Sequence, residues 1–129
     1  MPTAERILVA EDGKRQCAEL VGILERMGWR EILTAHTAHE AIRMAMQSRP
    51  DVVIVDGLLP GMHGFEVARF IRNSDPAYRP RIIFVTAVYK NIRYQNEAKL
   101  TYGIDAYVIK PVSEDAIRAA LQTTTAAAA

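Results

Sequence analysis

Four short apolar runs of the sequence each end in residues that can take part in chemistry. The runs and the polar residues after them are Ile7–Ala10 with Glu11 and Asp12, Val52–Val55 with Asp56, Ile82–Val85 with Thr86, and Tyr107–Ile109 with Lys110. A single acidic residue after such a run is common and indicates little. Four polar ends of compatible chemistry on four runs are much harder to obtain by chance, so the set predicts a site.

The chemistry of this set is that of a charged cluster with three carboxylates, one hydroxyl and one ammonium group. Three carboxylates close together repel one another, most strongly where water is partly excluded. Lys110 can neutralise one of these charges, and a divalent cation can offset the rest. Mg²⁺ suits the set because it takes one or two carboxylates and fills its other positions with water and phosphate oxygens. Such a cluster favours phosphoryl transfer, with either a carboxylate or water as the nucleophile.

The elements that position these residues are predicted from the apolar pattern. The four runs are apolar throughout and rich in β-branched residues, which is typical of parallel strands covered by helices on both faces. Glu31–Ala35 is more polar and suits an edge strand. Helical spacing of apolar residues links Cys17, Leu20, Val21, Leu24 and Met27, and likewise Ala38, Ala41, Ile42, Ala45 and Met46. Strand and helix alternate five times, which predicts an α/β fold with a parallel sheet, whose strands end at one ligand crevice.

Two segments are less regular than the rest. Val88–Tyr102 is polar with scattered apolar positions, and we expect a loosely packed helix there. Thr123–Ala129 is of low complexity and is expected to be a frayed tail or the start of a linker, so the predicted domain spans residues 5–122.

Composition excludes several classes of protein. The 129 residues are 50% hydrophobic, which fits one compact domain. Sixteen Lys and Arg against fifteen Asp and Glu argue against a general nucleic-acid or membrane-surface binder. The single cysteine excludes an intramolecular disulfide framework. No apolar run approaches the roughly 18 residues of a membrane span, and we expect a cytoplasmic protein.

Several motifs together carry a resemblance to a known family. They are Ile7–Asp12, Asp51–Asp56, Leu59–Gly64, Thr86–Ala87 and Tyr107–Pro111. In their order and spacing the chain resembles the receiver domain of two-component response regulators, from about Glu5 to Gln122. The resemblance implies a flavodoxin-like, doubly wound sheet of five parallel strands in the order 2-1-3-4-5. Five helices would cover it in a three-layer αβα sandwich.

The resemblance also implies roles for the residues at the strand ends. Asp56 looks like the aspartate that accepts a phosphoryl group from a histidine kinase or a phosphotransfer protein. Glu11 and Asp12 look like the acidic pair that holds Mg²⁺ directly or through water, with Asp56 and the backbone carbonyl of Leu58 as further ligands. Lys110 would pair with Asp56 at rest and with a phosphoryl oxygen afterwards. The chain would then be a regulatory domain that assists its own phosphorylation and dephosphorylation, not an enzyme.

Further residues would transmit the effect of phosphorylation from Asp56 to the rest of the domain. Thr86 would move to bind another phosphoryl oxygen, and Tyr107 looks like the aromatic switch whose rotamer follows it. The resemblance implies a cis peptide bond before Pro111. Because Val88–Tyr102 is the least anchored neighbour of the site, we expect it to shift together with the strand after it. Leu58 and Val88 stand at positions that influence phosphoryl lifetime in the family.

Other functions remain as alternatives. A degenerate pseudo-receiver would act as an interaction module without phosphorylation. A haloacid-dehalogenase-like phosphohydrolase needs a second Asp two residues after the first, where this chain has Leu58, and a toprim-type site lacks the same Asp. A flavodoxin would need a phosphate-binding loop where Glu11 and Asp12 would repel phosphate.

The output surface is less defined by the sequence. We expect an attached output domain or a downstream protein partner, no nucleic acid bound by this domain itself, and no membrane. Dimerisation is left open, with Tyr89, Tyr94 and Tyr102 as aromatic surface. We expect His63 to face solvent from a loop and Gly57 to leave the site open.

Overall fold

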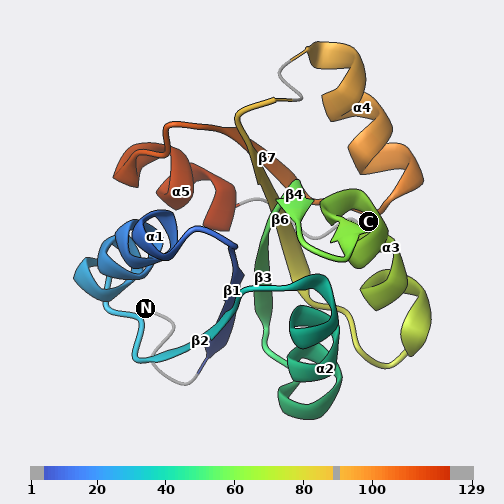
Figure 1. Cartoon of the computed structure of the whole chain (residues 1–129), viewed down its shortest axis with the longest axis horizontal. Helices are drawn as coiled ribbons and strands as arrows, with labels where there is room; N and C mark the ends of the chain where they lie inside the picture. The colour runs from blue at the N-terminus through green and yellow to red at the C-terminus, as the bar shows by residue number, and fades with distance from the viewer. Residues whose placement is uncertain (1–4, 89–90, 123–129) are drawn as a thin grey trace.

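The computed structural model describes residues 5–88 and 91–122, which form one parallel sheet with helices on both faces (Figure 1). The strands of the main sheet are β1 (Arg6–Ala10), β2 (Glu31–Ala35), β3 (Val52–Asp56), β6 (Arg81–Thr86) and β7 (Ala106–Ile109). Their order is β2-β1-β3-β6-β7, and all neighbours are parallel. This is the predicted order 2-1-3-4-5, so the predicted fold is confirmed.

Five helices connect the strands in the described part of the chain. They are α1 (Lys14–Arg26), α2 (Ala38–Ser48), α3 (Gly64–Ser74), α4 (Ile92–Thr101) and α5 (Glu114–Leu121). Side-chain caps begin most of them: Thr37 accepts a hydrogen bond from the Glu40 N–H, and Ser113 accepts one from the Ala116 N–H. No helix in the described ranges is long and apolar enough to cross a membrane.

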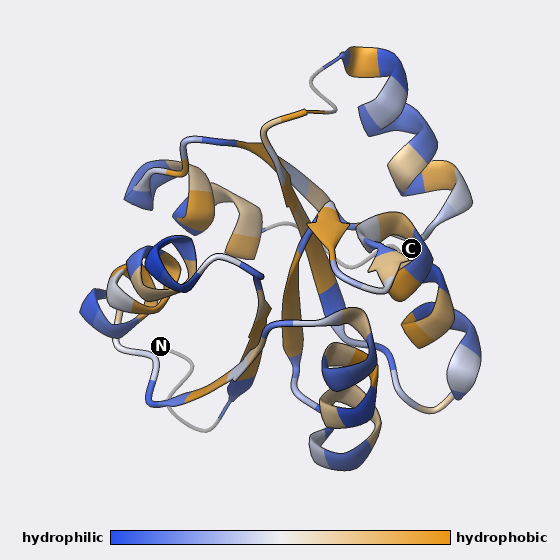
Figure 2. Ribbon diagram, viewed as in Figure 1, coloured by the Kyte–Doolittle hydropathy of each residue, from blue (hydrophilic) through white to orange (hydrophobic). Residues whose placement is uncertain are grey.

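Alternate residues of each strand build two separate cores. Ile7 and Val9 point to the side where α1 and α5 pack, and Leu8 and Ala10 point to the side of α2 and α3. Both faces of the central strands are therefore buried, and Figure 2 shows them as an apolar centre surrounded by helices with polar outer faces. Cys17 lies in the first of these cores, as its place on the apolar stripe of α1 predicts.

Two segments differ from the predictions. The polar helix begins at Ile92 rather than near Val88, because the Asn91 side chain accepts a hydrogen bond from the Arg93 N–H at 2.7 Å and caps it. After β3 the chain forms an unpredicted hairpin, β4 (Leu58–Leu59) and β5 (Met62–His63), which turns at Gly61 with φ +96°. Tyr89 and the segment Thr123–Ala129 lie outside the described residues.

Candidate functional site

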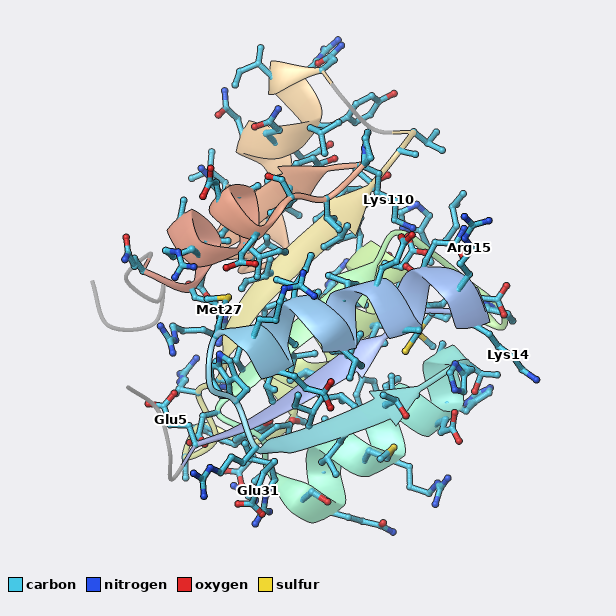
Figure 3. All side chains as sticks on the ribbon, turned by 90° about the vertical axis from the view of Figure 1, so that its left-hand side faces the viewer. Glu5, Lys14, Arg15, Met27, Glu31 and Lys110 are labelled. Atoms are coloured by element: carbon cyan, nitrogen blue, oxygen red, sulfur yellow. The ribbon has the colours of Figure 1, made fainter. Side chains whose placement is uncertain are left out.

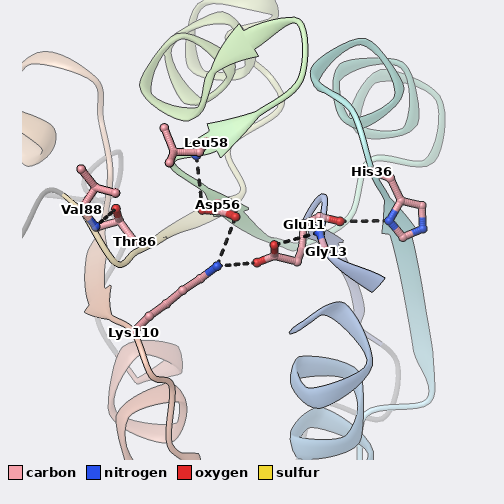
Figure 4. Close-up of polar contacts among 8 residues, drawn as sticks. All are labelled: Glu11, Gly13, His36, Asp56, Leu58, Thr86, Val88 and Lys110. Carbon is pink, nitrogen blue, oxygen red and sulfur yellow. Dashed lines mark hydrogen bonds and ion pairs between the residues drawn. The ribbon is translucent and has the colours of Figure 1, made fainter. Parts of the chain in front are cut away.

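The ends of three strands meet at one ammonium group. Lys110 follows β7, and its Nζ lies 2.9 Å from Glu11 Oε1 and 3.2 Å from Asp56 Oδ2 (Figure 4). Glu11 follows β1 and Asp56 ends β3, so 99 and 54 residues of sequence separate the lysine from its two partners. Parallel strands that end at the same edge of the sheet bring these groups together, as the sequence predicts.

The two carboxylates are buried and share one counter-charge. Glu11 is 3% exposed and Asp56 8%. Burial raises the pKa of Glu11, and the neighbouring Asp56 raises it further, while the bond from Lys110 opposes both effects. For Lys110, burial alone would lower the pKa, but Glu11 and Asp56 outweigh burial and raise it. The lysine therefore stays charged, and it is shared between two carboxylates.

Asp12 does not join this pair. Its side chain is exposed, and among the described residues no three His, Cys, Asp or Glu side chains lie close enough to hold a metal ion by themselves. In this structure Lys110 pairs with two of the three expected carboxylates, while the exposed Asp12 lines a hollow together with Gly57 and Leu58. Two buried carboxylates that share one lysine fit Mg²⁺, which needs only one or two carboxylates from a protein.

The loops beside Asp56 and Thr86 complete the surroundings of the site. Asp56 Oδ1 accepts a hydrogen bond from the Leu58 N–H at 3.3 Å, and Thr86 Oγ1 accepts one from the Val88 N–H at 3.1 Å. Thr86 is fully buried, whereas the side chains of Leu58 and Val88 are 54% and 56% exposed. The Lys110–Pro111 bond is cis, as the resemblance implies.

Two glycines, Gly57 and Gly64, allow the loop after β3 to pack. The packing role of Gly64 was not predicted from the sequence. A Cβ on Gly64 would lie 2.3 Å from the carbonyl oxygen of Asp56, so only glycine fits there. A Cβ on Gly57 would lie 2.8 Å from Cζ of the buried Phe84. Gly57 was expected to leave the site open, but Phe84 fills the space beside it.

Aromatic rings pack beneath this loop. Phe65 stacks on Phe84 at 4.2 Å between ring centroids and on Tyr102 at 4.9 Å, and Tyr107 lies 5.2 Å from Phe84. His63 stacks on Phe65 at 5.0 Å, and its Nδ1 accepts a hydrogen bond from the Phe65 N–H at 3.1 Å. The expectation that His63 faces solvent is therefore wrong, because its ring caps α3, and burial lowers its pKa.

The family model named response regulator receiver domain matches residues 7–122. The chain belongs to the response regulator receiver domain family. Protein PilH of Pseudomonas aeruginosa is 29% identical over 113 residues, covering 87% of this chain and 90% of PilH. The probable transcriptional regulatory protein TcrX of Mycobacterium tuberculosis is 38% identical over 108 residues, covering 83% of this chain and 44% of TcrX.

Solved structures agree with this membership. A CheY-like receiver domain from Methanospirillum hungatei JF-1 superposes with a TM-score of 0.79 at 27% identity, covering 92% of this receiver domain and 90% of that chain. The receiver domain spans less than half the length of the transcriptional regulatory proteins AfsQ1, YvrH and TcrX. It is thus a regulatory signal-transduction domain, comparable to the whole of PilH and to one part of the longer relatives.

Proposed function

We propose that this receiver domain accepts a phosphoryl group on Asp56 in a Mg²⁺-dependent reaction, from a histidine kinase or a histidine phosphotransfer protein. The observation that supports it is the Lys110 ammonium between the buried carboxylates of Glu11 and Asp56, at the open end of the sheet. A carboxylate oxygen of Asp56 forms a bond to phosphorus, and the bond from phosphorus to the donor's imidazole nitrogen breaks. The imidazole leaves with the electron pair and takes up a proton.

The residues around Asp56 would then have defined tasks. Lys110 moves from the carboxylates to a phosphoryl oxygen, where its positive charge offsets the added negative charge. Glu11, Asp12, Asp56 and the backbone carbonyl of Leu58 would hold Mg²⁺, which supplies positive charge against the phosphoryl oxygens. The exposed side chains of Leu58 and Val88 flank the site and would hinder an attacking water.

The response would pass through Thr86 and the segment after it. The Thr86 hydroxyl would move to donate its hydrogen to a phosphoryl oxygen, and we propose that this movement breaks the bond it accepts from the Val88 N–H. The Val88 backbone, at the start of the connection to α4, is then no longer held by this hydrogen bond. We propose that α4 and β7 shift together with the Tyr107 ring as a result.

The donor is proposed to approach along a groove beside α1. This groove has a volume of about 660 Å³ and is lined by apolar side chains of α1 and of the loop after β7, among them Leu20, Ile23 and Val112. Glu11 and Lys110 also line it, so a partner seated there reaches the site. Figure 3 shows α1 in front of the sheet, with Lys110 near the end of the helix that carries Arg15. The output would follow through an attached domain or a separate protein partner, without direct binding of nucleic acid by this domain.

Intact-mass spectrometry after incubation with acetyl phosphate tests the proposal. We expect a single phosphoryl adduct with Mg²⁺, none after the metal is removed with EDTA, and none in Asp56→Asn. Asp51→Asn is the matched control, because Asp51 is an exposed carboxylate just before β3, and it should be labelled like the unsubstituted domain. Equal labelling of Asp56→Asn would contradict the proposal, because another residue would then carry the phosphoryl group. No adduct from either acetyl phosphate or a histidine phosphodonor would also contradict it and would favour a pseudo-receiver.

A further inference from the structure

The main chain of Glu11 is held by the turn between β2 and α2. The β1 ladder with β2 ends at Ala10, and one residue further the Glu11 N–H donates a hydrogen bond to the Ala35 carbonyl at 2.9 Å. The Glu11 carbonyl lies 2.9 Å from Nδ1 of His36 (Figure 4). Both main-chain polar groups of Glu11 are thus bonded to two consecutive residues, Ala35 and His36.

The direction of the His36 bond follows from chemistry. A carbonyl oxygen only accepts hydrogen bonds, so the imidazole must carry hydrogen on Nδ1. The neutral tautomer with hydrogen on Nδ1 and the doubly protonated ring both meet this requirement. The contact therefore depends on the position of the ring nitrogen and not on the charge of the ring.

His36 is itself fixed by the start of α2. Its backbone N–H donates to Glu40 Oε1 at 2.7 Å, and the Glu40 N–H donates to the Thr37 side chain at 3.2 Å. This reciprocal arrangement anchors the first turn of the helix. The ring thus extends from a rigid helix start onto the Glu11 carbonyl.

We infer that His36 is a positioning residue for the acidic loop Glu11–Gly13. A peptide unit is planar, so a fixed Glu11 carbonyl also fixes the N–H of Asp12 and the direction in which Asp12 leaves the strand. Asp12 is exposed, and its placement depends on its backbone.

This role rests on the proposed function, in which Lys110 leaves Glu11 for a phosphoryl oxygen. The Glu11 carboxylate then loses its bond from Lys110 and keeps the one from the Gly13 N–H at 3.2 Å. At that stage the loop is held by the bond that the Glu11 N–H donates to Ala35 and by the bond that the Glu11 carbonyl accepts from His36.

The test uses the whole chain with substitutions at one position. In His36→Ala we expect faster amide hydrogen exchange at Asp12 and Gly13 in the metal-free protein, and about 10-fold weaker binding of Mg²⁺ by calorimetry, the usual loss when a group that orients a ligand is removed. His36→Asn should restore both, because its side-chain amide nitrogen is as many bonds from Cα as Nδ1. His36→Gln should not. His39→Ala, on an exposed histidine in the first turn of α2, is the matched control and should behave as the unsubstituted protein.

The outcomes separate this role from the proposed function. Unchanged exchange and Mg²⁺ affinity in His36→Ala, in a protein that is phosphorylated on Asp56, would overturn the role of His36 and leave the proposed function standing. Restoration by Gln rather than Asn would overturn it as well. If the unsubstituted protein neither bound Mg²⁺ nor accepted phosphate, the proposed function would fail and the inference with it.

Discussion

The half of the molecule that carries the carboxylates is held much more firmly than the helix next to the switch residues. α2 has three fully buried residues, Ala38, Ala41 and Ala45, while α4 has one, Ala98. Two of the apolar side chains of α4 are largely in solvent, Ile92 at 67% and Leu100 at 86% exposure. Figure 1 shows α4 standing away from the sheet, whereas α2 and α3 pack along it. The groups that do the chemistry are thus on rigid elements, and the segment expected to respond is loosely attached.

α4 is nevertheless anchored at one end. After it, Tyr102 stacks on Phe65, Ile104 is fully buried, and Arg72 donates hydrogen bonds to the Gly103 carbonyl at 2.7 and 3.1 Å. The other end follows Asn91, whose side chain caps the helix. We therefore expect α4 to move about its C-terminal end when the domain is phosphorylated.

The largest expected effect comes from removing that anchor. Arg72→Ala would leave the Asp105 carboxylate, which is 1% exposed, without the guanidinium 2.9 Å away, and would also free the carbonyls of Gly103 and Pro80. Breaking a buried ion pair in this way costs about 3–5 kcal/mol in free energy of unfolding. Urea denaturation measures the loss. Arg69→Ala, on an exposed face of the same helix, should change stability by less than about 0.5 kcal/mol, and similar losses in both variants would show that Arg72 is no anchor.

A matched pair of leucines compares a firmly packed helix with α4 directly. Leu24→Ala on α1 removes a fully buried side chain and should cost about 2–5 kcal/mol. Leu100→Ala on α4 makes the same change at 86% exposure and should cost less than about 0.5 kcal/mol. Thermal or urea unfolding of the two variants provides the comparison. A loss of more than 2 kcal/mol in Leu100→Ala would mean that α4 is packed as firmly as α1.

The smallest expected effect concerns α5, which is tied to α1 by an ion pair. Glu114 of α5 pairs with Arg118 and with Arg26 of α1, and these bonds lower its pKa below 4.5. A carboxylate whose pKa is lowered by folding stabilises the protein above its unfolded pKa, and this stability is lost as the pH falls through the folded pKa. Glu114→Gln should therefore be slightly less stable than the unsubstituted protein at pH 7 and equal to it at strongly acid pH. A difference that persists in acid would point to packing rather than charge.

Much of the fold could be predicted because its signals are local. Each strand is a continuous apolar run with its polar residue directly after it, so both the sheet and the meeting of Glu11, Asp56 and Lys110 follow from short stretches of sequence. The hairpin after β3 could not be predicted, because its strands have only two residues each and depend on Gly64 lying against the Asp56 carbonyl. Contacts between residues that are far apart in the sequence could not be predicted either.

The contacts between distant residues explain the remaining differences. Phe84 fills the space beside Gly57, 27 positions earlier in the chain, and Arg72 meets Asp105 across 33 positions. His63 lies in an aromatic stack formed by α3 and β6 rather than in solvent. Asp12 follows Glu11 in sequence, but it is exposed, whereas Glu11 is buried beside Asp56. In each case the sequence shows which residue is present but not which residues surround it in the folded domain.

The central claim is that phosphorylation of Asp56 shifts α4, while the firmly packed elements around the carboxylates keep their positions. Hydrogen exchange followed by mass spectrometry, with Mg²⁺ and with or without acetyl phosphate, tests it most directly, with Asp56→Asn as the control that should not respond. We predict that exchange changes in peptides covering residues 91–109 and stays the same in peptides covering β2 and α2, residues 31–48. A change centred on residues 31–48, or one spread evenly along the phosphorylated chain, would contradict the account.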